Sequence, residues 1–161
     1  MSTLTLSDIR KPQALGLLAL FLVVVLGVGT RLGFLTAPGE WYDSLNKPPF
    51  NPPSWIFAPV WTTLYVLIAI AGWRTFLSDA HGAAMKLWYA QMALNWLWSP
   101  VFFGLHMLWP ALIVILLLDG AVLAFIANRW SRDRAAALMF VPYAAWVLFA
   151  SLLNLSIAIL N

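Results

Sequence analysis

The sequence of 161 residues contains no cysteine, only two histidines and few charged residues. Without thiols the chain can form no disulfide and no zinc–thiolate site, and thiolate catalysis is excluded. His81 and His106 stand too far apart in sequence to form an obvious metal-binding motif. Glycine-rich phosphate loops, nucleophile elbows and paired catalytic carboxylates are also missing. We therefore expect no metal site and no obligatory cofactor.

The scarcity of charge is matched by an excess of apolar residues. Charged residues make up 9% of the chain and hydrophobic residues 63%, and the mean hydropathy is +0.86. Globular domains are roughly half apolar and about a quarter charged, so a lipid-facing exterior is expected and the chain is predicted to be an integral membrane protein. The net charge of +3 does not indicate nucleic acid, because the basic residues form no stripe.

Five apolar stretches are each long enough to cross a bilayer as a helix, which takes about 20 residues. A cleaved signal peptide is the alternative for the first stretch, but its apolar run exceeds the roughly 7–15 residues of a signal core. The sequence therefore predicts an all-α membrane protein, a five-transmembrane-helix bundle in which residues 1–161 form a single domain. The predicted spans are about 13–35, 55–77, 84–103, 109–129 and 135–160.

The basic residues predict how these helices are oriented. Cytoplasmic loops of membrane proteins carry an excess of lysine and arginine. Two basic residues, Arg31 and Lys47, fall on one side of the predicted spans, and the other seven fall on the opposite side: Arg10, Lys11, Arg74, Lys86, Arg129, Arg132 and Arg134. We expect a cytoplasmic N-terminus and an external loop at residues 41–54. A helical bundle would normally suit a bacterial inner membrane, but which membrane holds this protein is left open.

The one long connection, between the first and second spans, is stiffened by proline. Pro48, Pro49, Pro52 and Pro53 lie within six residues, and each fixes its own φ and restricts the residue before it. One interpretation is a rigid turn with an aromatic belt at the membrane surface. The other is a lid that closes one end of the bundle. The residues alone favour the two equally.

Aromatic and amide side chains recur at helical spacing on three of the spans. Because an unpaired amide in hydrocarbon is costly, these faces are expected to point inward. The stripes could be packing between helices or the walls of a ligand pocket. Their members are Trp61, Tyr65 and Ile68 on the second span, Gln91, Asn95, Trp98 and Phe102 on the third, and Tyr143, Trp146, Ala150 and Asn154 on the fifth.

Two further features lie inside the predicted membrane spans. Asp119 sits near the centre of the fourth span, where a carboxylate is costly and is a candidate proton carrier or ligand contact. The alternative is a protonated acid that bonds a neighbouring helix or a second copy of the chain. Gly29 and Gly33 form a GxxxG pair, a spacing that allows a close helix crossing.

Four segments resemble the TspO/translocator protein family, also called the peripheral benzodiazepine receptors. They are WYxxLxKPxxxPPxW, FxPVWxxLY, QxxLNWxWxPxFFG and PYxxWxxFxxxLN, in that order over about residues 40 to 155. The resemblance implies a five-helix bundle, usually a homodimer, that binds porphyrins such as protoporphyrin IX, haem-related tetrapyrroles and synthetic isoquinoline carboxamides. It places a pocket beneath the first loop, with Tyr42, Trp55, Phe57, Ala58, Trp61, Asn95, Trp98, Tyr143, Trp146, Ala150 and Leu153 as its residues.

The chain also departs from the family pattern. The family's cholesterol motif needs a tyrosine followed by a basic residue, whereas Leu155 stands at the tyrosine position and residues 156–161 hold no lysine or arginine. Sterol recognition through this motif is therefore not expected. Pro110 replaces a frequent tryptophan, and Asp119 falls where many members carry a neutral residue.

Three functions remain as hypotheses. The first is a membrane protein that binds tetrapyrroles in porphyrin sensing, regulation or transport. The second is light-dependent degradation of protoporphyrin IX, with Trp61 and Trp146 as the catalytic candidates because an indole is readily oxidised. The third is a proton-coupled transporter of small molecules that uses Asp119.

Overall fold

The computed structural model of the chain describes residues 11–161, and Arg10, one of the basic residues used to predict orientation, lies outside this range. The described residues are largely helical and contain no strand. In chain order the elements are α2 (Pro12–Leu35), α3 (Glu40–Ser44), the 3-10 turn η1 (Ser54–Ile56), α4 (Phe57–Asp79), α5 (Ala83–Ser99), the π-helical segment η2 (Pro100–Gly104), α6 (Leu108–Arg129) and α7 (Arg134–Leu160).

Four helical segments of the described chain are long and apolar enough to cross a membrane: Pro12–Leu35, Ser54–Asp79, Leu108–Arg129 and Arg134–Leu160. The remaining long helix, α5, has 17 residues and carries several polar side chains. It continues without a break into η2, where the Leu105 amide donates to the Pro100 carbonyl at 2.8 Å in the wider π pattern. The five-span count therefore stays a prediction, with α5 and η2 together as the fifth candidate.

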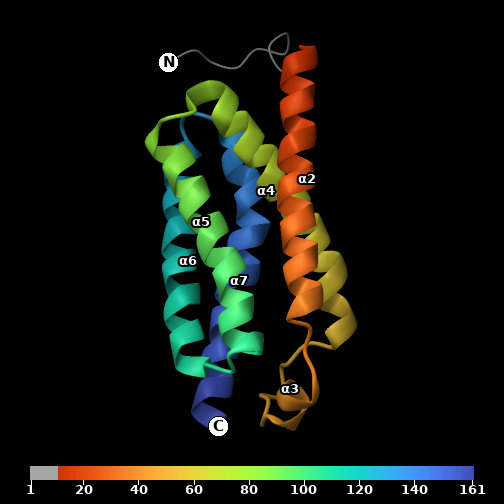
Figure 1. Cartoon of the computed structure of the whole chain (residues 1–161). Helices are drawn as coiled ribbons and strands as arrows, with labels where there is room; N and C mark the ends of the chain where they lie inside the picture. Colours follow the sequence, from red (N-terminus) through yellow and green to blue (C-terminus); the bar gives the residue numbers. More distant parts are fainter. Residues whose placement is uncertain (1–10) are drawn as a thin grey trace.

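The long helices run side by side, and consecutive ones are antiparallel (Figure 1). Helix α2 packs mainly on α4, α4 on α7, and α6 on both α5 and α7. The start of α2 and the α4–α5 and α6–α7 turns lie at one end, here called the basic end, and α3 and the C-terminus lie at the other, the loop end (Figure 1). Basic residues of the described chain gather near the first of these ends, as expected. The direction of the bundle across a membrane stays a prediction.

The exterior of the bundle is apolar, unlike that of a soluble protein. Large apolar side chains point outward, among them Phe34 at 85% exposed and Val23 at 70%. Some polar side chains are buried together with the apolar core: Thr75, Gln91, Asn95, Asp119, Arg129, Ser151 and Asn154. This arrangement suits a bilayer, where the lipid solvates the apolar exterior and polar groups must find partners inside the bundle.

The two glycines of the GxxxG pair have different surroundings. Gly29 is buried, and a Cβ atom added to it would overlap the ring of Tyr65 on α4. Gly33 faces open space. Gly29 therefore permits the close contact between α2 and α4 within one chain, and the pair does not act as a single docking face.

This difference predicts opposite effects for the same substitution. Alanine is normally better than glycine inside a helix by up to about 1 kcal/mol, so Gly33→Ala is expected to leave stability unchanged or improve it. Gly29→Ala should instead lower stability by about 1–3 kcal/mol, because the new methyl group must displace the Tyr65 ring. Thermal unfolding of the two variants in the same detergent checks this, and equal unfolding temperatures would contradict the proposed role of Gly29.

Candidate functional site

A chain of hydrogen bonds joins three helices in the centre of the bundle. The Tyr65 hydroxyl on α4 donates to Asn95 Oδ1 on α5 at 3.1 Å. Asn95 Nδ2 donates to the Tyr143 hydroxyl on α7 at 2.9 Å, and that hydroxyl donates to Gln91 Oε1 at 3.0 Å. All four side chains are buried. The polar faces predicted on these helices therefore meet one another, and at these atoms they serve to hold the helices together.

Aromatic rings extend this polar chain along α4 and α7. The Trp61 ring lies 5.3 Å from that of Tyr65 and 6.4 Å from that of Tyr143, measured between centroids. Phe57 on α4 meets Trp146 on α7 at 5.8 Å. Trp61 and Trp146 are both half-buried, and because each contacts a ring of the other helix, both indoles lie at the interface between α4 and α7.

A groove of about 570 Å³ runs between α4 and α7, and we call it the α4–α7 groove. It is open along the outer face of the helix pair, unlike an enclosed pocket, and its walls are almost entirely apolar. Trp146 forms part of its lining, and its indole Nε1 is buried with no hydrogen-bond partner among the described residues. The lining residues are Pro59, Val60, Thr63, Leu64, Pro142, Ala145 and Trp146.

A second aromatic cluster lies at the loop end. Trp98 stacks on Phe102 at 5.3 Å, and its indole donates to Asn154 Oδ1 on α7 at 3.1 Å. The Asn154 amide in turn donates to the Leu108 carbonyl at the start of α6, at 3.0 Å. Tyr42 and Leu153 are buried against the same cluster. Trp98 thus connects the central residues with those under the loop.

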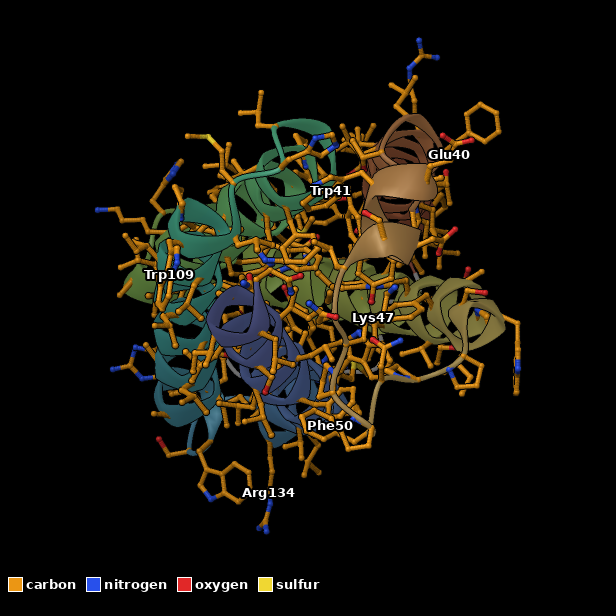
Figure 2. The ribbon with its side chains drawn as sticks, turned by 90° about the horizontal axis from the view of Figure 1, so that it is seen from below. Glu40, Trp41, Lys47, Phe50, Trp109 and Arg134 are labelled. Carbon is orange, nitrogen blue, oxygen red and sulfur yellow. The ribbon has the colours of Figure 1, made fainter. Side chains whose placement is uncertain are left out.

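The long loop is fastened to the end of the bundle, which Figure 2 shows from below. The amide N–H of Asn46 donates to Asn161 Oδ1 at 3.0 Å, and Phe50 contacts Phe149 of α7 at 6.4 Å between centroids. Trp41 stacks on His106 in the α5–α6 connection at 4.0 Å, with 14° between the ring planes. Sequence reasoning considered His106 only as a metal ligand and missed this stack, for which the sequence offers no signal.

Tyr42 is held by the loop itself. Its hydroxyl donates to Asn51 Oδ1 at 2.9 Å, and Lys47 Nζ lies 4.7 Å from its ring centre. Burial raises the pKa of Tyr42, with a smaller contribution from the nearby Asp43, while the hydrogen bond to Asn51 acts in the opposite direction. The phenol therefore stays neutral at physiological pH and keeps its proton for this bond.

The structure brings together most, but not all, of the residues implied by the family resemblance. Phe57, Trp61, Asn95, Tyr143, Trp146 and Ala150 belong to the central group, and Tyr42, Trp98 and Leu153 belong to the loop-end cluster. Trp55 is 72% exposed and Ala58 is also exposed. Their part in a site stays a prediction. Tyr65 and Gln91, which complete the polar chain, were recognised as members of the stripes but not as site residues.

Asp119 bonds a neighbouring helix. Ser151 Oγ on α7 donates to its Oδ2 at 2.7 Å, while its Oδ1 is buried without a partner among the described residues. Of the two interpretations drawn from the sequence, this contact agrees with an acid that joins adjacent helices. It places the carboxyl group between α6 and α7.

Comparison with known proteins gives the chain a family. The TspO/MBR family model matches residues 19–160. The protein CrtK of Rhodobacter capsulatus is 40% identical over 92% of this chain and 95% of its own. The tryptophan-rich sensory protein of Cereibacter sphaeroides is 40% identical over 89% and 92%, and the human translocator protein is 35% identical over 79% and 78%.

The polar chain predicts an order of effects for two conservative substitutions. Tyr143→Phe leaves both the Asn95 amide N–H and the Gln91 carbonyl without a hydrogen-bond partner, whereas Tyr65→Phe leaves only the Asn95 carbonyl without one. Each buried polar group left without a partner lowers the free energy of unfolding by about 1–3 kcal/mol, although single hydrogen bonds in membrane proteins contribute nearer 0.6 kcal/mol on average. Unfolding in detergent should show roughly twice the loss for Tyr143→Phe. Tyr89→Phe, at a half-exposed ring, is the control, and equal losses at Tyr65 and Tyr143 would contradict the network.

Proposed function

This chain is a membrane protein of the TspO/MBR family, and from that premise we propose that it binds tetrapyrroles such as protoporphyrin IX or haem through helices α4, α5 and α7. The observation that carries the proposal is that each of α4 and α7 places an indole against an aromatic ring of the other helix, Trp61 against Tyr143 and Trp146 against Phe57, and that Trp146 also lines the α4–α7 groove. The proposed role is porphyrin sensing, regulation or transport.

The chemistry of this region suits a large flat ligand. A porphyrin is an aromatic disc with two propionates at its rim. Trp61 and Trp146 offer ring faces for stacking, worth about 0.5–1.5 kcal/mol per aromatic pair beyond the area buried. The unpartnered indole N–H of Trp146 can donate to an oxygen at the rim. Apolar walls with a few placed polar groups are the usual make-up of ligand sites.

The same residues would accept synthetic ligands of the isoquinoline carboxamide class, which are flat and carry a carbonyl acceptor. We also propose a homodimer in a bacterial membrane, with the basic end of the bundle in the cytoplasm. The loop that holds Tyr42 would then cover the binding region from the outside, as a lid fastened to the C-terminus of α7.

One observation favours light-dependent degradation of the porphyrin as a second function. The rings of Tyr65 and Tyr143 lie 5.3 Å and 6.4 Å from that of Trp61. An excited porphyrin stacked on Trp61 could take one electron from the indole, leaving a porphyrin radical anion and an indole radical cation, and a neighbouring phenol could re-reduce the indole by giving up an electron and its proton. The chain would then act as a photochemical enzyme with Trp61 and Trp146 as catalytic residues.

Binding is tested by removing indole faces one at a time. Trp61→Leu and Trp146→Leu keep the positions apolar but delete the stacking surface, so each should weaken protoporphyrin IX binding by roughly 2- to 10-fold. Titration of the porphyrin absorbance in detergent measures this. Trp109→Leu, at a 56% exposed ring on α6, is the matched control and should bind like the parent chain. Equal affinity in all four proteins would rule out this site.

Illumination separates the two functions. If the chain degrades the porphyrin, Trp61→Phe and Trp146→Phe should slow the light-driven loss of the Soret band at least tenfold, at porphyrin concentrations that saturate each variant. If the chain only binds, bleaching should run at the same rate in the parent and both variants. The second result would leave the binding proposal intact and remove the enzymatic one.

A further inference from the structure

A buried arginine closes the basic end of the bundle, away from the residues discussed above. Arg129 is the last residue of α6, and its side chain is 2% exposed. Burying a guanidinium without a paired anion costs several kcal/mol, so such a side chain normally has a partner that offsets its charge.

The partnerless atoms of Arg129 are Nε and Nη2, which are buried and have no hydrogen-bond acceptor among the described residues. The N–H groups of these two nitrogens point outward from the same edge of the planar guanidinium group. That edge matches the spacing of two oxygens of a carboxylate or phosphate, which it binds through two parallel hydrogen bonds. An edge of this kind without an acceptor presents the two donors that an oxyanion binds.

Arg74 lies at the same end of the bundle, and its corresponding Nε–Nη2 edge binds a carboxylate. Its Nε and Nη2 hold the carboxylate of Asp133 through bonds of 2.9–3.3 Å. Asp133 also caps α7, where its Oδ1 accepts from the Ala136 amide at 3.2 Å. The nearest acid to Arg129 along the chain is therefore already engaged, by a salt bridge and by a helix terminus.

The other groups near Arg129 partly offset its charge but give its Nε–Nη2 edge no hydrogen-bond acceptor among the described residues. Asp79 and Asp133 act on its charge through space, without a hydrogen bond to it among the described residues, and Arg132 opposes them. The Asp79 carboxylate lies against Gly82 in the α4–α5 turn. Two further buried groups at this end also lack partners, the hydroxyl of Thr75, which follows Arg74, and Oδ1 of Asn128. The hydroxyl can donate to an anion, whereas the Asn128 oxygen can only accept, for instance from a bound water.

We propose that the Nε–Nη2 edge of Arg129 binds a phosphate-type oxyanion, supplied either by free phosphate or by the phosphate headgroup of a lipid. The anion would enter through the turn between α6 and α7, where Trp130 is 46% exposed and Arg132 is exposed. The surrounding positive charge of Arg132 and Arg134 attracts anions to this surface. The site is independent of tetrapyrrole binding.

The free-phosphate arm uses the full chain in a zwitterionic detergent. Inorganic phosphate should raise the unfolding temperature more than sodium chloride at equal ionic strength, because a ligand that binds only the folded state stabilises it. Arg129→Lys keeps the charge but loses the paired donors, so its apparent affinity for phosphate should fall at least tenfold. Arg132→Lys, at an exposed neighbour, is the matched control and should respond like the parent chain.

The lipid arm places the same three proteins in nanodiscs of phosphatidylcholine, with or without phosphatidic acid. A stabilisation by phosphatidic acid that is lost in Arg129→Lys, without any response to free phosphate, identifies a lipid headgroup. A response in the detergent arm alone identifies free phosphate, and a response in both leaves the oxyanion site common to the two.

The proposal is overturned if the parent chain responds to phosphate only as it does to chloride and to phosphatidic acid only as it does to phosphatidylcholine. It is equally overturned if Arg129→Lys keeps the full response. Should Arg129→Lys fail to fold, native mass spectrometry of the parent chain and of Arg132→Lys decides, because a specific site retains one phosphate or one phosphatidic acid per chain. Equal retention by those two proteins is expected, and no retained adduct in either overturns the site.

Discussion

The hydrogen-bonded chain through Tyr65, Asn95, Tyr143 and Gln91 is the constraint on which the centre of this protein depends. In hydrocarbon no water can satisfy these groups, so each must find a partner inside the bundle. The partners come from α4, α5 and α7, which fixes how each helix is rotated about its axis. Once those rotations are set, Trp61 on α4 and Trp146 on α7 must lie near the same interface, because each is within a turn of a residue of the polar chain.

The loop end depends on a related device. Asn154 accepts from the Trp98 indole and donates to the Leu108 carbonyl, so one amide joins α5, α6 and α7. Asn46 and Asn161 fasten the loop to the last turn of α7 through hydrogen bonds in both directions. The loop prolines at positions 48, 49, 52 and 53 reduce the entropy that the loop loses on becoming ordered. A stiff loop fixed at these points is better described as a cover of the bundle than as a free connector.

Much of this could be predicted from the sequence, because apolar stretches and helical spacing are local properties. The helices begin and end within three residues of the apolar stretches, apart from the switch to a π-helix at Pro100. Spacing also predicted which faces of α4, α5 and α7 turn inward. It could not predict partners, since periodicity defines a face but not the helix it meets. The sequence therefore allows two interpretations of Asp119, and only the structure shows that Ser151 lies beside it. The stack between Trp41 and His106 likewise has no signal in the sequence.

The polar atoms that stay unpaired are as informative as the paired ones. Native proteins leave few buried polar groups without a partner, and each exception calls for an explanation. Among the described residues, the exceptions include the indole N–H of Trp146, a residue that lines the α4–α7 groove. They also include the Nε–Nη2 edge of Arg129, at the charged turn between α6 and α7. Both are donors, and both are buried near the outside of the bundle, the first at a groove and the second at a turn between helices. A ligand that supplies an acceptor would give each of these donors a hydrogen-bond partner. A rearrangement of the helices that supplied one would break contacts that the helices already make.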